Sequence, residues 1–159
     1  MKLYKNFLSK NDFDNLETFI MNDYMPWYYN DGLIVVPDEY FQFTFMFVND
    51  QKINCTEKSM NILQPVLAKI KYKTLNRIKA NLTVKQNKHI EYEMHIDQQK
   101  GTTGILYIND NNGYTKFKDG TKIKSEKNTY IEFDSKTKHT GASCTDEKRR
   151  VVINFNYNL

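Results

Sequence analysis

Two imidazoles and one carboxylate in the second half of this 159-residue chain have the chemistry of a metal site. His95 and Asp97 are separated by a single isoleucine, and His139 follows farther along the chain. Two histidines and one acidic side chain can hold ferrous iron on one face and leave its other coordination positions open for a cosubstrate and dioxygen. If the three side chains converge, we expect the chemistry of an oxygenase.

The spacing of His95 and Asp97 suits one metal ion, because residues two apart on a β-strand project to the same face. Residues 89–97 alternate between polar and apolar types, which predicts such a strand. The same alternation fits an amphipathic strand with its polar side in water, so the pattern alone does not require a metal. His89 lies six residues before His95, too far along a strand to be the third ligand, which leaves His139.

The basic residues are almost all lysines, although the chain carries a formal net charge of +4. Arg77, Arg149 and Arg150 are the only arginines, so each is a candidate for a specific role. The densest lysine run falls within residues 116–127. This run fits a solvated face or an electrostatic guide for an anionic substrate, and we favour the solvated face.

The length of the chain fits one domain, residues 1–159, and no segment is apolar for long enough to span a membrane. The first ten residues contain no apolar run of signal-peptide length. Cys55 and Cys144 are too few for a disulfide scaffold and lack the paired spacing of a zinc site. We expect a cytoplasmic protein with two reduced thiols and no membrane partner.

Helices are expected within residues 1–73, a region we interpret as helical and aromatic support. Apolar residues recur at helical spacing over residues 13–20, and Ser9 or Asn11 can cap this first helix. Helical spacing recurs over residues 58–71. Pro65 inside that second pattern must either kink the helix or mark its start.

Large aromatic side chains are concentrated in residues 24–40, whose prolines and glycine indicate a loop. These rings either fill the core or line a pocket, and we favour the core because large rings must be buried somewhere in so small a domain. Residues 41–48 alternate phenylalanine with other residues, which predicts a strand.

Period-two alternation from residue 74 onward predicts a β-rich second half. Asp119-Gly120 indicates a tight hairpin, because glycine tolerates the positive φ that such a turn demands. The fold class we predict is mostly β with helices (α+β), a sandwich or barrel of the jelly-roll type with the early helices packed outside and residues 74–159 as its core. The strands expected here cover residues 74–84, 89–97, 102–109, 129–133 and 150–157.

Five pieces of sequence follow one another within residues 77–159: His95-x-Asp97, residues 103–109, residues 113–117, His139 and Arg150 at the head of the last strand. In order and spacing they resemble the iron(II)- and 2-oxoglutarate-dependent oxygenase superfamily, in particular its prolyl-hydroxylase-like branch, which includes compact phage-encoded members. Two departures are visible: Tyr114 replaces a common second glycine, and the region before His95 lacks a tyrosine that several members carry.

The resemblance implies a double-stranded β-helix in which His95, Asp97 and His139 bind Fe(II). It also implies 2-oxoglutarate as the cosubstrate, with dioxygen as the second cosubstrate. The far carboxylate of 2-oxoglutarate would lie inside the barrel, where an uncompensated charge is costly. An arginine solves that problem, because its planar guanidinium can pair with a carboxylate through two parallel hydrogen bonds.

Arg149 and Arg150 are the candidates for this arginine, and neighbouring residues on a strand face opposite ways. Arg150 shares its face with Val152, Asn154 and Asn156, whereas the alternate residues beside Arg149 are strongly apolar. A cavity that receives a polar acid needs a mixed lining, so we choose Arg150. The family's Arg-x-x-Ile pattern implies the same choice.

Tyr107 resembles the family's tyrosine that reaches the far carboxylate, although a core role fits it equally well. Asn154 is a third candidate contact. Peptidyl proline is the leading substrate by resemblance, with a nucleobase or small metabolite as the alternative and a non-catalytic cupin-like binding module as a rival function. Nucleic acid is therefore not the favoured partner, and the oligomeric state is left open. Residues 24–40 or the turn at 110–114 are expected to position the substrate.

Overall fold

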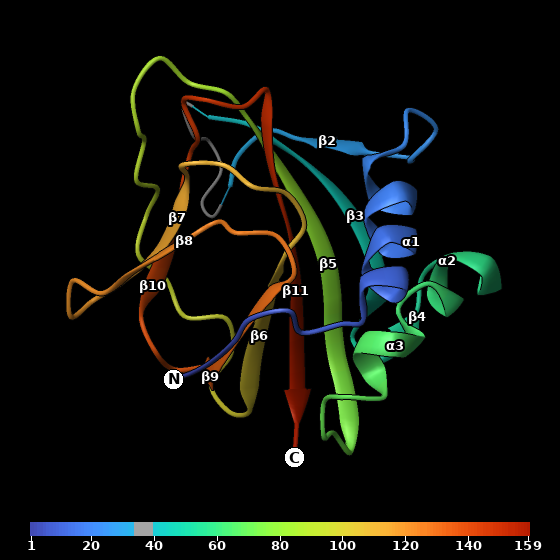
Figure 1. The fold of residues 1–159 in the computed structure, drawn as a ribbon. Helices are drawn as coiled ribbons and strands as arrows, with labels where there is room; N and C mark the ends of the chain where they lie inside the picture. Colours follow the sequence, from blue (N-terminus) through green and yellow to red (C-terminus); the bar gives the residue numbers. More distant parts are fainter. Residues whose placement is uncertain (34–39) are drawn as a thin grey trace.

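Two antiparallel β-sheets face each other, and the helices cover the outer side of the larger sheet (Figure 1). The computed structural model describes residues 1–33 and 40–159. Pro37, part of the predicted aromatic loop, lies outside the described residues. The predicted fold class, mostly β with helices outside a jelly-roll-like body, is confirmed.

Within the described residues, the larger sheet has eight strands and the smaller one has three. The strand order of the larger sheet is β1-β9-β6-β11-β5-β3-β2, with β4 paired to β3. The strand order of the smaller sheet is β10-β7-β8. Residues 1–73 therefore contribute strands to the same sheet as residues 74–159. The larger sheet contains β1 (Lys2–Tyr4), β2 (Tyr28–Asn30), β3 (Gln42–Asn49), β4 (Lys52–Ile53), β5 (Thr74–Val84), β6 (Thr102–Tyr107), β9 (Thr129–Asp134) and β11 (Arg149–Asn158); the smaller contains β7 (Tyr114–Phe117), β8 (Lys122–Lys124) and β10 (His139–Ala142).

The first helix, α1 (Lys10–Met21), begins as predicted, because the Ser9 hydroxyl accepts a hydrogen bond from the Asp12 N–H. The prediction of one helix over residues 58–71 is corrected. The chain forms α2 (Glu57–Asn61) and then α3 (Gln64–Leu67), with proline in the first turn of α3. Proline lacks an N–H and fits a first turn but not a helix interior, so the helix restarts there. Among the described residues, no helix has the length and apolarity that a membrane crossing requires.

The alternation along β11 separates two environments. Residues 151, 153, 155 and 157 face the helices and belong to the main core, which also contains Leu16 of α1. Residues 150, 152 and 154 line a cavity between the sheets. The apolar face thus supplies the burial that stabilises the sheet, while the other face is free to carry polar groups. The sheets also meet over a smaller apolar cluster of Ile105, Tyr107, Phe117, Ile131, Phe133 and Val152.

The predicted strand over residues 89–97 is not formed. This segment pairs with the chain around β10 only through isolated bridges, Glu91 with Ala142 and His95 with His139. Glu91 instead directs its carboxylate to Lys116, at 2.5 Å. Without a continuous ladder the side chains need not alternate, and both Tyr92 and His95 line the cavity. The expected shared face therefore holds only locally, at His95 and Asp97.

The Asp119-Gly120 hairpin is confirmed: β7 and β8 pair, and Gly120 has a φ of 90°. The aromatic side chains of residues 24–40 divide between two environments. Trp27 packs against the main core, as expected for a ring that fills the interior. Tyr28 and Tyr29 are 64% and 59% exposed.

Close packing around Gly104 in β6 gives a test of the sheet. A Cβ at this position would approach Cζ of Tyr130 to 2.5 Å, and Tyr130 is fully buried and stacked on Phe7 at 4.4 Å. We expect Gly104→Ala to lower the free energy of unfolding by about 1–3 kcal/mol through overpacking. Thr102→Ala, on the same face of β6, is the matched control and should cost less than about 1 kcal/mol. Equal denaturant midpoints for the two variants would contradict the packing described.

Candidate metal centre

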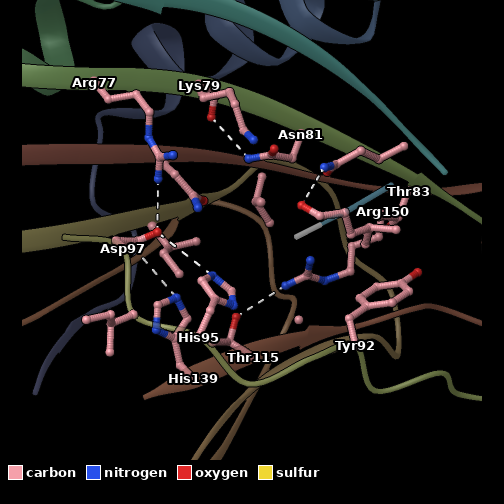
Figure 2. Close-up of a pocket in the computed structure, with 17 residues that line it drawn as sticks. Arg77, Lys79, Asn81, Thr83, Tyr92, His95, Asp97, Thr115, His139 and Arg150 are labelled. Carbon is pink, nitrogen blue, oxygen red and sulfur yellow. Dashed lines mark hydrogen bonds and ion pairs between the residues drawn. The ribbon is translucent and has the colours of Figure 1, made fainter. Parts of the chain in front are cut away.

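His95 and His139 lie directly opposite each other and exchange both backbone hydrogen bonds, each at 3.0 Å. Residues paired in this way carry their side chains on the same side of the two chains. The ring centroids are 4.6 Å apart, and Figure 2 shows both imidazoles at one end of the cavity. His139 is the first residue of β10, which the sequence analysis did not predict as a strand.

Asp97 completes the cluster. Nε2 of His95 lies 3.9 Å from Oδ1 of Asp97, and Nε2 of His139 lies 3.7 Å from Oδ2. One potential ligand atom from each residue lies within 4.8 Å of the other two. The structure therefore brings together the three side chains chosen from the sequence (Figure 2).

Both imidazoles are oriented by main-chain carbonyls. Nδ1 of His139 lies 2.9 Å from the Thr137 carbonyl, and Nδ1 of His95 lies 3.2 Å from the Glu93 carbonyl. A carbonyl only accepts, so each Nδ1 carries the hydrogen and each Nε2 keeps its lone pair toward the cluster. Burial, followed by the charge of His139, lowers the pKa of His95 and favours its neutral form.

An orphaned atom tests whether a metal fits here. Nε2 of His139 is buried, and no described residue hydrogen-bonds to it. Buried nitrogen atoms rarely lack partners, and a lone pair pointing at a carboxylate and a second imidazole is the donor set of a divalent first-row metal. The carbonyl bonds at Nδ1 match the outer contacts that usually orient metal-binding histidines. The residues present therefore fit a metal such as Fe(II).

The Asp97 carboxylate is almost fully buried and accepts a hydrogen bond at each oxygen. Arg77 donates from Nη2 to Oδ1 at 2.9 Å, and the Thr103 hydroxyl donates to Oδ2 at 2.7 Å. Burial alone raises the pKa of this carboxyl, but the electrostatic interactions with His139 and Arg77 and the bond from Thr103 outweigh it. The pKa of Asp97 therefore lies below its ordinary value, and the carboxylate stays ionised.

Asn156 of β11 links Arg77 to Thr103, the two residues that donate hydrogen bonds to Asp97. Its Oδ1 accepts from Nε of Arg77 at 2.8 Å, and its Nδ2 donates to the Thr103 hydroxyl at 2.9 Å. β5, β6 and β11 are thereby joined around one carboxylate. The sequence analysis singled out Arg77 for its rarity but assigned no role to it, to Thr103 or to Asn156.

The cavity beside this cluster has a volume of about 370 Å³. Polar side chains at every second position of β5 form one of its walls, a pattern that was readable in the sequence as a polar strand face. The lining residues are Leu33, Gln42, Arg77, Lys79, Asn81, Thr83, Tyr92, His95, Ile96, Asp97, Ile105, Thr115, His139, Gly141, Arg150, Val152 and Asn154.

Arg150 points into this cavity and is 5% exposed. Nε donates to the Ser125 hydroxyl at 2.8 Å, and Nη2 donates to the Thr115 hydroxyl at 3.2 Å. No carboxylate of the described residues pairs with it. Burial lowers the pKa of the guanidinium, which still remains charged at neutral pH. Gly113 leaves room for the side chain, because a Cβ there would lie 2.7 Å from Cδ of Arg150.

Arg149 takes the opposite direction. Its Nη2 donates to the Met21 carbonyl at 3.0 Å, at the C-terminal end of α1. A cation at this position satisfies a carbonyl that the helix leaves free. The two arginines thus face opposite sides of β11, as the alternation predicted.

Tyr107 and Asn154, the other two predicted contacts, differ in position. Tyr107 is fully buried behind the cavity wall, where its hydroxyl donates to Thr115 at 2.8 Å and its ring centroid lies 5.8 Å from Cζ of Arg150. Burial raises its pKa to about 12. Asn154 lines the cavity, and its Oδ1 has no hydrogen-bond partner among the described residues.

The contacts of Thr103 give a test of the metal site. Thr103→Val removes the hydroxyl that holds Asp97, and we expect the affinity for Mn(II) to fall about 10- to 100-fold. Thr103→Ser keeps the hydroxyl and should bind Mn(II) nearly as the wild type does. Calorimetric titration measures both. An unchanged affinity in a folded Thr103→Val variant would show that this bond does not support the site.

Comparison with solved structures identifies proteins of the same fold. A Trichoplax adhaerens prolyl hydroxylase in complex with a hypoxia-inducible-factor peptide fragment is 11% identical, with a TM-score of 0.68 over 99% of this chain and 83% of that one. A 2OG-Fe(II) oxygenase family oxidoreductase from Burkholderia pseudomallei is 11% identical, with a TM-score of 0.64 over 94% of this chain and 78% of that one. A Pseudomonas putida prolyl-4-hydroxylase is 12% identical, with a TM-score of 0.61 over 99% and 92%.

No protein-family model and no curated protein sequence matches the chain. Identities of this size establish a shared architecture without identifying a substrate. The chain therefore has the fold of prolyl hydroxylases and other 2OG-Fe(II) oxygenases.

Proposed function

We propose that the protein is an Fe(II)- and 2-oxoglutarate-dependent dioxygenase that hydroxylates an unactivated C–H bond. One observation carries the proposal: a cluster of two imidazoles and a carboxylate shares a cavity with a buried arginine that no described carboxylate neutralises. A metal suits the cluster, and a carboxylate suits the arginine. A cosubstrate that chelates a metal at one end and carries a carboxylate at the other satisfies both.

In this proposal His95, Asp97 and His139 hold Fe(II), and Arg150 pairs with the far carboxylate of 2-oxoglutarate. Iron with 2-oxoglutarate and dioxygen supplies the oxidising chemistry, in which the cosubstrate becomes succinate and carbon dioxide and a C–H bond gains a hydroxyl group. The rest of the task belongs to the chain. It must fix the ligand atoms and keep the charged cosubstrate out of bulk water.

The hydrogen bonds around the cavity suit that task. Arg77 and Thr103 fix both oxygens of Asp97, so the carboxylate has one orientation. Tyr107 acts on Arg150 through Thr115, which accepts a hydrogen bond from each of them. In this scheme Tyr107 positions the arginine, and Asn154 is the further polar contact that faces the ligand.

Peptidyl proline is the substrate we propose first. The support is the fold shared with prolyl hydroxylases, one of which is in complex with a peptide fragment. A nucleobase or small metabolite is the alternative within the same chemistry. Leu33 lines the cavity and Tyr40 packs against Tyr92 at 5.8 Å, so the chain that flanks residues 34–39 reaches the site. Trp27 packs against the core and is the weaker candidate for contact with a substrate.

We also propose that residues 1–159 act as one oxygenase domain in the cytoplasm. The shared fold extends over 99% of the chain, which supports a single functional unit. Cys55 and Cys144 are free thiols, as is usual in a reducing compartment.

Paired arginine variants test the cosubstrate assignment. Arg150→Met should raise the 2-oxoglutarate concentration for half-maximal succinate release by at least about tenfold, because a buried carboxylate loses its cation. Arg149→Met removes the same charge on the opposite face of β11 and should leave that concentration unchanged. If the wild type with Fe(II) releases no succinate, the binding-module alternative is favoured. If both variants shift equally, the assignment of Arg150 is wrong.

A substrate panel tests the proline proposal. Succinate release should rise when proline-containing peptides are added and not when the same peptides carry alanine in place of proline. Mass spectrometry should then find one added oxygen on proline. If only nucleosides or free amino acids stimulate succinate release, proline is not the substrate and the alternative substrates are favoured.

A further inference from the structure

Lys79 is a half-buried cation that the proposed roles leave unused. It lies on β5, lines the cavity, and its Nζ has no hydrogen bond or ion pair with any described residue. Burial, assisted by the charge of Arg77 and opposed by Asp97, lowers its pKa to about 8. An ammonium that is largely withdrawn from water and has no ion-pair partner is costly, so its presence in a wall of the cavity calls for a ligand.

The charges around the cavity do not balance. Three basic side chains line it, Arg77, Lys79 and Arg150, and Asp97 is the single carboxylate among the described lining residues. With neutral histidines the net charge is +2. Arg77 is already paired with Asp97, at 2.9 Å, so the surplus lies on Lys79 and Arg150. A ligand with two negative charges would compensate both.

The strand register separates these two cations along the cavity. Lys79 lies opposite Asn154 in the β5–β11 pair, and Arg150 lies opposite Thr83. Four residues of strand, at about 3.3 Å each, place Lys79 about 13 Å from Thr83 along β5. Both side chains line the same cavity from adjacent strands (Figure 2). A ligand that meets both cations must therefore carry its two acid groups at separate ends.

A second unsatisfied group lies beside Lys79. Oδ1 of Asn154, directly across the strand pair, has no hydrogen-bond partner among the described residues. Cross-strand neighbours on one face have their Cβ atoms close together, so the amide and the ammonium border the same space. Two adjacent unpartnered polar side chains are better explained by a ligand than by folding, because folding gains nothing from either.

We propose that Lys79 and Arg150 form a two-cation site that binds a short dicarboxylate, one carboxylate at each cation, without a metal. The identity of the natural ligand as 2-oxoglutarate or its product succinate rests on the proposed function. The site itself rests on two cations that line one cavity without a carboxylate partner among the described residues. Lys79 is then a residue that selects ligands with two acid groups, and the metal is not needed to retain them.

Metal-free protein, stripped with a chelating resin, tests this directly. We expect calorimetric titration to detect binding of 2-oxoglutarate, glutarate and succinate, and to show propionate, with one carboxylate, binding at least about tenfold more weakly. Lys79→Met should weaken the dicarboxylates about 10- to 100-fold and change propionate little. Lys88→Met, which removes an exposed lysine after β5, is the matched control and should bind as the wild type does.

Folding of the variant is checked by circular dichroism, which should match the wild type, and by retained Mn(II) binding, because no hydrogen bond or ion pair joins Lys79 to the metal-site residues among the described residues. Lys79→Gln serves as a second variant, and the comparison of dicarboxylates with propionate needs no variant. Failure of metal-free wild type to bind dicarboxylates, or equal binding by wild type and Lys79→Met, overturns the proposal. If 2-oxoglutarate binds only to Mn(II)-loaded protein, this inference fails alone. If it binds to neither form, the proposed function fails as well.

Discussion

The reciprocal backbone pairing of His95 with His139 is the contact on which the site depends. His95 belongs to a segment without a continuous strand, which is attached to β10 only at spaced hydrogen bonds. This pair of bonds places the backbone of His95 against β10, and the Glu93 carbonyl orients its ring. β10 is itself held by β7 over four residue pairs, so His139 sits on a rigid strand and His95 is positioned against it. This arrangement joins a ligand on a strand to a segment that is bonded to that strand at a few separate points.

The carboxylate is held by a different principle. Asp97 is buried, and a buried charge is tolerable only when opposite charge and hydrogen bonds compensate it. Arg77 supplies the charge, Thr103 supplies a bond to the other oxygen, and Asn156 fixes both donors. Three strands of the larger sheet thus meet at one side chain. A metal would add charge to a carboxylate whose orientation is already set.

Local patterns predicted most of the sheet and the ligand set, and they failed where tertiary contacts decide. Alternation gave the faces of β11 and the direction of Arg150, because a strand with one apolar face has only one stable register against the core. The same reasoning was wrong for residues 89–97. This segment forms isolated bridges instead of a continuous strand, and Glu91 forms ion pairs with Lys116 and Lys122. The roles of Arg77 and Thr103 could not be read from spacing, because their partner Asp97 is on a different element. Lys79 was visible as a lysine on a strand face, but only the fold shows that this face lines a cavity.

The two faces of the larger sheet explain how the fold can keep such a polar interior. The apolar residues of β11 pack against Leu16 and its neighbours in the main core, and this burial is independent of what lines the cavity. The opposite face carries Arg150 and Asn154, whose polar groups contribute little to folding and are unfavourable when they lack partners. Stability and binding are therefore assigned to opposite sides of the same strands. The wall of the cavity can then retain cations and amides without partners, and a ligand that forms hydrogen bonds and ion pairs with them is bound more tightly.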